Sequence, residues 1–124
     1  MLKLEDTYLH KGKRKALVAE LRKKGIQNES VLEAINTLPR HFFFDTALIS
    51  HAYEDKAFPI GEGQTISQPY TVAFQSSLLE VIPGDKILEI GTSDQQLILV
   101  KQRIIYFNVI LLARCLEVRG YIYV

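Results

Sequence analysis

The sequence predicts an α/β fold in which N-terminal helices precede the first strand of a Rossmann-like parallel sheet. Apolar residues recur at helical spacing in two segments before Pro39. The run from Gln68 to Gly91 then reads as helix, tight turn, short apolar strand and glycine. A doubly wound sheet begins in this order, and its ligands bind beyond the carboxyl ends of the strands. A polar, glycine-containing loop at 59–70 lies just before this run.

Length and composition indicate one domain without disulfides. The chain of 124 residues suffices for a single core, and its formal net charge of +1 gives no electrostatic case for a nucleic-acid partner. The single cysteine, Cys115, excludes an internal disulfide and suits a reducing, cytoplasmic setting. Charged residues interrupt the first ten positions, so no signal peptide is predicted. The apolar run before Arg114 is too short to span a membrane.

The first predicted helix spans residues 11–24 and follows a loosely held arm, residues 1–10. Its apolar face consists of Leu17, Val18 and Leu21. Gly25 is placed to end it in the left-handed conformation. A basic run begins this helix and consists of Lys11, Lys13, Arg14 and Lys15. The run could be a nucleic-acid patch or a solvated helix face, and we favour the solvated face because no aromatic stacking residues lie among the cations.

The second predicted helix has Asn28 as its N-cap and ends before Pro39, which disfavours helical geometry at the preceding residue. Its apolar stripe consists of Val31, Leu32, Ile35 and Leu38. The three phenylalanines at 42–44 are predicted to lie in the core, and Asp45 is predicted to cap a short helix. His41 and His51 have no third ligand nearby in the sequence, so no metal site is predicted.

Residues 53–67 are predicted to be irregular because they are rich in glycine and proline. Within them, Gln64, Thr65 and Ser67 precede Pro69, a residue that favours the first turn of a helix. A loop at a helix start presents N–H groups without intrahelical partners, so it can hold a carboxylate or another anion.

The following helix is predicted from Gln68 to about Ile82. Its predicted apolar face consists of Tyr70, Phe74, Leu78, Val81 and Ile82. Ser76 and Gln75 are predicted to be more exposed. A turn at 83–85 and a strand at 86–90 complete the pattern.

Four motifs then reveal a resemblance. In order, they are Arg40-His-Phe-Phe, Ala52-Tyr-Glu-Asp, the run from Pro59 to Tyr70, and Pro83-Gly-Asp-Lys-Ile-Leu-Glu-Ile-Gly-Thr92. Together they strongly resemble the protein-L-isoaspartate O-methyltransferase family over residues 11–92. The run 64–70 is specific to this family, whereas 88–91 is shared by many S-adenosylmethionine-dependent methyltransferases.

The resemblance implies transfer of a methyl group from S-adenosylmethionine to the carboxylate of isoaspartyl residues in damaged proteins and peptides, for repair. It implies Ser67 as the catalytic residue, although plain N-capping of the next helix is the alternative role for this serine. The implied cofactor-binding residues are Thr65, Ile66, Ser67, Glu89 and Gly91. The implied substrate-binding residues are Gln64, Thr65 and Pro69. No metal, nucleic-acid or membrane partner is predicted.

The resemblance ends at Thr92, where the family continues with a glycine-rich loop and this chain reads Ser93-Asp-Gln-Gln96. We therefore expect a methyltransferase part at 1–92 and a divergent apolar tail at 93–124. We hypothesise a truncated family member with a reading-frame change near Thr92, and the alternative is a genuine short variant with a repurposed C-terminus. An incomplete sheet exposes apolar edges, so self-association is expected. Two functions stay open: the family enzyme, and a non-catalytic remnant that lacks a competent cofactor pocket and binds peptide weakly at most.

Overall fold

The computed structural model describes residues 5–61, 63–89, 105–108 and 122–123. Its α-helices are α1 (Tyr8–Lys23), α2 (Glu29–Thr37) and α3 (Pro69–Leu78). Two short 3₁₀ helices, η1 (Arg40–Phe43) and η2 (Thr46–His51), follow α2. The strands are β1 (Phe58–Gly61), β2 (Gln64–Ile66), β3 (Lys86–Glu89), β4 (Ile105–Asn108) and β5 (Ile122–Tyr123).

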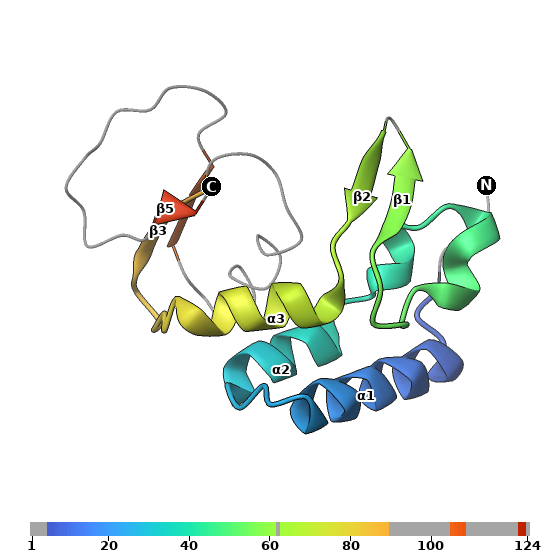
Figure 1. The fold of residues 1–124 in the computed structure, drawn as a ribbon, viewed down its shortest axis with the longest axis horizontal. Coiled ribbons are helices and arrows are strands. Elements are labelled where there is room, and N and C mark those ends of the chain that lie inside the picture. The colour runs from blue at the N-terminus through green and yellow to red at the C-terminus, as the bar shows by residue number, and fades with distance from the viewer. Residues whose placement is uncertain (1–4, 62, 90–104, 109–121, 124) are drawn as a thin grey trace.

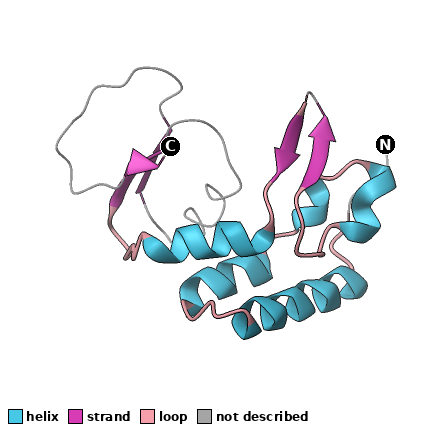
Figure 2. Ribbon diagram, viewed as in Figure 1, coloured by secondary structure: helices cyan, strands magenta, loops and turns pink. Residues whose placement is uncertain are grey.

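The three α-helices pack on one another beneath two separate groups of strands (Figures 1 and 2). Figure 1 shows the β1–β2 hairpin over the end of α3 where that helix begins, and the sheet that contains β3 beyond its other end. None of the helices in the described ranges is long and apolar enough to cross a membrane.

Helix α1 begins earlier than the sequence predicts. Thr7 is its N-cap, and the Thr7 hydroxyl accepts a hydrogen bond from the backbone N–H of His10. The His10 side chain bonds back to the Thr7 backbone, which completes a capping box. The predicted loose arm over residues 1–10 is therefore wrong from Thr7 to His10. The predicted end is confirmed, since Gly25 has a φ of 103° just past the helix.

Helix α2 agrees with its predicted signals. The Asn28 side chain accepts from the backbone N–H of Val31 at 3.2 Å, as an N-cap does. Leu38, directly before Pro39, is extended with a ψ of 119° and ends the helix. Val31 and Leu32 lie in the core, with Ile35 and Leu38 packed against it.

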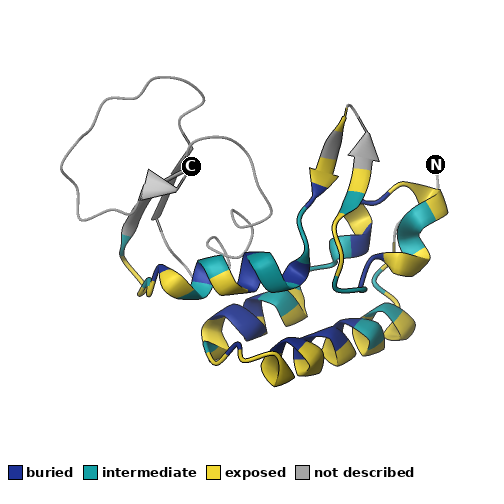
Figure 3. Cartoon of the chain, viewed as in Figure 1, coloured by how far each residue is buried: buried dark blue, intermediate teal, exposed yellow. Residues whose placement is uncertain are grey.

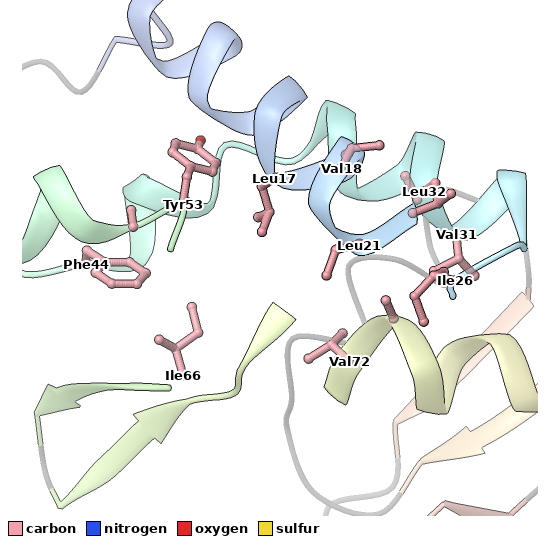
Figure 4. Packing of buried hydrophobic residues seen from close by; sticks show 13 residues of the cluster. Leu17, Val18, Leu21, Ile26, Val31, Leu32, Phe44, Tyr53, Ile66 and Val72 are labelled. Carbon is pink, nitrogen blue, oxygen red and sulfur yellow. The ribbon is translucent and has the colours of Figure 1, made fainter. Parts of the chain in front are cut away.

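The hydrophobic core lies between α1, α2, the start of α3 and the segment 44–66 (Figure 4). Phe44 belongs to it, but Phe42 and Phe43 are 37% and 51% exposed, so the prediction of three core phenylalanines is wrong for two of them. The reason is the 3₁₀ geometry of η1, in which side chains three residues apart point the same way. His41 and Phe44 have that spacing, and both are buried.

Helix α3 buries a different face from the predicted one (Figure 3). Its buried residues are Pro69, Val72, Ala73 and Ser76. The large side chains of Phe74, Leu78 and Ile82 are 46%, 64% and 63% exposed, and Ser76, predicted to be exposed, is 1% exposed. The helix carries two apolar faces, and the one with smaller side chains packs against α2 and α1. The helix also ends at Leu78, before the predicted Ile82.

The prediction that residues 53–67 are irregular is wrong for part of this segment, because β1 and β2 pair antiparallel as a hairpin. Gly63 turns the chain with a φ of 68°, a conformation that favours glycine. An irregularity in the pairing follows Pro59, which lies in a strand with one partner and so tolerates the missing N–H.

Strand β3 has parallel neighbours on both sides, as a doubly wound sheet requires. It is entered through the predicted turn, in which Gly84 has a φ of 98° and the Asp85 carboxylate accepts from the backbone N–H of Ile82 at 2.9 Å. Strands β4 and β5 lie in the predicted tail, 93–124, and the rest of that tail lies outside the described residues.

Arg14 is buried with 4% exposure, so the prediction of a solvated basic face is wrong for this residue. Its guanidinium donates to both carboxylate oxygens of Asp6 at 3.0 Å and to the Tyr53 hydroxyl at 3.2 Å. Its Nε–H donates to the carbonyl of Asn36. The hydrogen bonds from Arg14 to Asp6 hold the pKa of Asp6 below its usual value. Arg14 thus ties α1 to the end of α2 and to the loop before β1.

Asp6→Asn should lower the free energy of unfolding by about 3 kcal/mol, because the buried Arg14 charge loses its counter-charge. Urea unfolding measures this change. Glu29→Gln is the matched control, since it removes the carboxylate partner of Arg22 in an exposed pair and should cost about 0.5 kcal/mol or less. Equal losses in the two variants would contradict the role of Arg14.

Candidate functional site

The segment from Gln64 to Pro69 joins the hairpin to α3, and its side chains face different surroundings. Thr65 is exposed, whereas Ile66 is 4% exposed and belongs to the hydrophobic core. Ser67 is half-buried in the connection between β2 and α3, and Pro69 is buried as the first residue of α3. At Ile66, therefore, the backbone but not the side chain is available to a cofactor.

Arg40 holds this segment from one side. Its Nη2 donates to the carbonyl of Ser67 at 2.8 Å, and its Nε donates to the carbonyl of Ala52 at 2.9 Å. A longer bond of 3.4 Å joins Nη2 to the carbonyl of Lys56. The guanidinium also lies over the ring of Phe44, 5.4 Å from its centroid. Arg40 therefore fastens the carbonyl of Ser67 to the loop between η2 and β1.

Asp55 holds the segment from the other side. Its Oδ1 accepts from the backbone N–H of Tyr70 at 2.7 Å, and its carbonyl accepts from the side-chain amide of Gln68 at 3.2 Å. Pro69 has no N–H, so the protein's own carboxylate already occupies the first available donor of α3. The prediction that this helix start binds an external anion is therefore wrong for the N–H of Tyr70, which is already bonded to Asp55.

The alternative role of Ser67 as an N-cap is also wrong. The N-cap of α3 is Gln68, whose side chain makes no capping hydrogen bond. The cap comes instead from the Asp55 carboxylate, which accepts from the N–H of Tyr70, fifteen positions later in the sequence. Tertiary contact thus supplies the interaction that a local serine was expected to make.

The charge of Asp55 is balanced although its side chain is only 3% exposed. Lys24 Nζ lies 2.5 Å from Asp55 Oδ2 and 2.7 Å from a carboxylate oxygen of Glu20. The bond to Asp55 is the main reason that the pKa of Lys24 is raised above its usual value. The C-terminal end of α1 is thereby joined to the N-terminal end of α3.

Glu89 occupies the carboxyl end of β3. Its register partners are Asn108 in β4 and Tyr123 in β5, so it lies at the end of the central strand. Ligands of open parallel sheets bind beyond that edge. Gly91, the other cofactor residue implied by the resemblance, lies outside the described residues. Gln64 is the first residue of β2, opposite Gly61.

The two halves of the predicted site are separated in the described structure. Ser67 lies next to the start of α3 and Glu89 lies on β3, which follows the other end of that helix. Figure 1 shows the hairpin and the sheet well apart, with α3 between them. The structure thus joins Ser67 to Arg40 and Gln68 to Asp55, whereas β3, which ends at Glu89, lies beyond the other end of α3.

Asp6, His10 and His41 each place one potential metal-ligating atom within 4.8 Å of the others. Their polar atoms are already engaged. His41 Nε2–H donates to the carbonyl of Glu5 at 3.2 Å, and its Nδ1 accepts from the Tyr53 hydroxyl at 2.7 Å. The His10 ring stacks on His41 with centroids 3.8 Å apart. Because Arg14 also pairs with Asp6, we assign no metal here.

Arg40 and Asp55 are the functional-site residues that the sequence reasoning missed. Both lie inside motifs that carried the family resemblance, yet neither received a role. The available signal was charged residues beside aromatic ones in two short motifs, Arg40-His-Phe-Phe and Ala52-Tyr-Glu-Asp. A charge in such surroundings is usually paired.

Comparisons with known proteins place this sequence in a family. The sequence model of the family described as protein-L-isoaspartate(D-aspartate) O-methyltransferase matches residues 12–111. A protein-L-isoaspartate O-methyltransferase of Cytophaga hutchinsonii is 66% identical over 89 residues, which are 72% of this chain and 40% of that protein. The counterpart in Christiangramia forsetii is 61% identical over 89 residues, 72% of this chain and 42% of that protein.

Solved structures agree on the fold. One protein-L-isoaspartate O-methyltransferase superposes with a TM-score of 0.64 and 25% identity, covering 77% of this chain and 33% of that structure. A putative one from Plasmodium falciparum, in complex with S-adenosyl-L-homocysteine, has a TM-score of 0.59 and 21% identity, covering 77% of this chain and 47% of that structure. These likenesses confirm the predicted α/β fold class.

The matches cover only part of each relative. The chain spans about two-fifths of the length of the curated relatives it matches. The family match extends past Thr92 to residue 111. The division of the chain at residue 92 stays a prediction.

Asp55→Ala should lower the free energy of unfolding by about 1 kcal/mol, because the first turn of α3 loses its cap. Urea unfolding followed by circular dichroism measures the loss. Asp45→Ala is the matched control, since the Asp45 side chain caps the short η2 through the N–H of Ala47. Amide exchange at Tyr70 should accelerate in the first variant alone. Unchanged exchange there would contradict the capping role.

Stability should fall as the pH decreases below 6.5. Burial is the main reason that the pKa of His41 lies below its usual value of 6.5, so the unfolded chain takes up a proton that the folded chain does not. The lowered pKa values of Asp6 and Glu54 reduce stability only when the pH falls below the usual pKa values of these groups, 3.8 and 4.5.

Urea unfolding between about pH 7.5 and 5 measures this dependence. His41→Gln should remove most of the slope, because an amide keeps a donor and an acceptor without titrating. Parallel slopes for the two proteins would contradict the assignment to His41.

Proposed function

The chain belongs to the protein-L-isoaspartate(D-aspartate) O-methyltransferase family, and on that premise we propose that it is an S-adenosylmethionine-dependent protein carboxyl methyltransferase. The proposed substrates are damaged proteins and peptides that contain isoaspartyl residues. The observation that carries the proposal is the segment 67–70, which Arg40 holds at Ser67 and Asp55 holds at Tyr70, at the start of α3. We further propose a cytoplasmic location, based on the single cysteine.

In the proposed reaction, the main task of the protein is to place the substrate carboxylate in line with the methyl group. The substrate carboxylate is already an anion at neutral pH, so no general base is needed to activate it. One of its oxygens forms a bond to the methyl carbon as the bond from that carbon to sulfur breaks, and no proton moves. Correct orientation of two reactants supplies about 7–11 kcal/mol of a barrier at best.

Ser67 is the residue that we propose orients the carboxylate. Its hydroxyl can donate a hydrogen bond to one carboxylate oxygen and so direct the other. Thr65, exposed two positions before Ser67, and Gln64 are proposed to contact the peptide. Pro69 is proposed to line the same site. The N–H of Tyr70 already donates to Asp55. The substrate carboxylate is therefore recognised by side-chain groups more than by the helix end.

We propose that Glu89 and Gly91 hold the cofactor. Glu89 lies at the carboxyl end of the central strand of a parallel sheet, where this class of fold binds its ligands. A carboxylate there can accept hydrogen bonds from hydroxyl or ammonium groups, and a glycine permits close approach of a ligand to the backbone. S-adenosylmethionine, when bound, supplies a methyl group on a positively charged sulfur that leaves as a neutral thioether.

A second candidate function is a non-catalytic remnant with at most weak peptide binding. The position of the β1–β2 hairpin and of β3 at opposite ends of α3 favours it, since methyl transfer requires substrate and cofactor in contact.

Calorimetry with S-adenosyl-L-homocysteine separates the two candidates. The enzyme should bind it with a dissociation constant on the order of micromolar, and the remnant should show no binding at about millimolar ligand.

If binding is present, Ser67→Ala should reduce methyl transfer to an isoaspartyl peptide by about 10–100-fold, because the carboxylate loses its orienting donor. Thr46→Ala, at an exposed hydroxyl on η2, is the matched control. A Ser67→Ala rate equal to that of the unchanged chain would remove Ser67 from the mechanism.

A further inference from the structure

We propose that Arg40 is a positioning residue for the reaction proposed above, and that it sets the place of Ser67 through the carbonyl of that serine. The inference rests on the proposed function and adds to it a residue that does not touch the reacting atoms. Arg40 lies twenty-seven positions before Ser67 in the sequence and reaches it across the molecule.

The bonds of Arg40 are arranged as a brace between two backbone segments. Its Nε donates to the carbonyl of Ala52 at 2.9 Å and its Nη2 to the carbonyl of Ser67 at 2.8 Å. Because the guanidinium is planar and rigid, the two carbonyls are held in one fixed relation. Ala52 is fully buried, so one end of the brace is set in the core. The other end holds the carbonyl of Ser67 through a hydrogen bond of 2.8 Å.

The segment that is braced has a second support three residues later. Asp55 accepts from the N–H of Tyr70 at 2.7 Å, and Asp55 belongs to the same loop that Arg40 bonds through Ala52 and Lys56. One loop, residues 52–56, thus supports the connection at both Ser67 and Tyr70. With both ends fixed, the backbone between them has little freedom, and the direction of the Ser67 side chain follows from it.

Lysine at position 40 would keep the charge but lose the brace. A lysine ends in a single ammonium nitrogen on a flexible stem, so it cannot hold two carbonyls in one plane. Arg40→Lys therefore separates the geometry of the side chain from its charge. Arg22→Lys is the matched control, because Arg22 forms a two-bond pair with Glu29 at the exposed end of α1.

The first measurement is amide hydrogen exchange on the full chain. Arg40→Lys should accelerate exchange about tenfold or more at Tyr70 and Val72. The amide of Leu21 should keep its rate, as it lies within α1. Unchanged rates at Tyr70 and Val72 would overturn the inference, whatever the protein proves to bind.

The second measurement is the affinity for an isoaspartyl peptide divided by that for the same peptide with ordinary aspartate. Arg40→Lys should reduce this preference about tenfold while Arg22→Lys leaves it intact, because misplacement of Ser67 weakens recognition of the carboxylate. The preference is measured where circular dichroism shows each variant folded, so lost stability alone would not change it.

The outcomes separate the two proposals. An unchanged preference in Arg40→Lys would overturn the positioning role even if the amides exchange faster. No preference in the unsubstituted chain would overturn the proposed function, and the exchange rates would then decide whether Arg40 fixes the Ser67 segment.

Discussion

The guanidinium of Arg40 joins parts of the molecule that the helices alone would leave unconnected. It is bonded to carbonyls of the loop 52–56 and to the carbonyl of Ser67, and it covers the ring of Phe44. Without such a donor, these carbonyls would be partly buried with fewer partners, at a cost in free energy. The hairpin, the loop and the start of α3 therefore keep their mutual placement because one side chain satisfies three acceptors.

Arg14 likewise joins separate segments of the chain through its hydrogen bonds. It bonds Asp6, Tyr53 and the end of α2 from within α1. Tyr53 and Asp55 belong to the same short loop, so the two arginines act on neighbouring parts of the chain. A small domain whose polar contacts converge on one loop gains a unique arrangement of its helices, since each charge has one geometry in which it is fully paired.

The start of α3 shows how such pairing limits function. A helix N-terminus attracts an anion, and here Asp55 is that anion at the N–H of Tyr70. Lys24 compensates the carboxylate from the end of α1. A substrate carboxylate would compete with a covalently attached one for the same donor, and the attached group has the advantage of proximity. Recognition by the neighbouring Ser67 hydroxyl avoids that competition.

The sequence by itself determined α2, the turn at 83–85, the strand after it and the family, because caps, glycines with positive φ and motifs act through neighbouring residues. Only the tertiary structure decided the burial of Arg14, the exposure of Phe43 and the face of α3 that packs. It also decided that Asp55, and not Ser67, caps that helix. Each of these depends on a partner far away in the chain: Arg14 is stable inside only because Asp6 and Tyr53 meet it there, and α3 turns its small side chains inward because two helices approach it closely. Local patterns carry no record of such partners, so the same residues admit several arrangements until packing selects one.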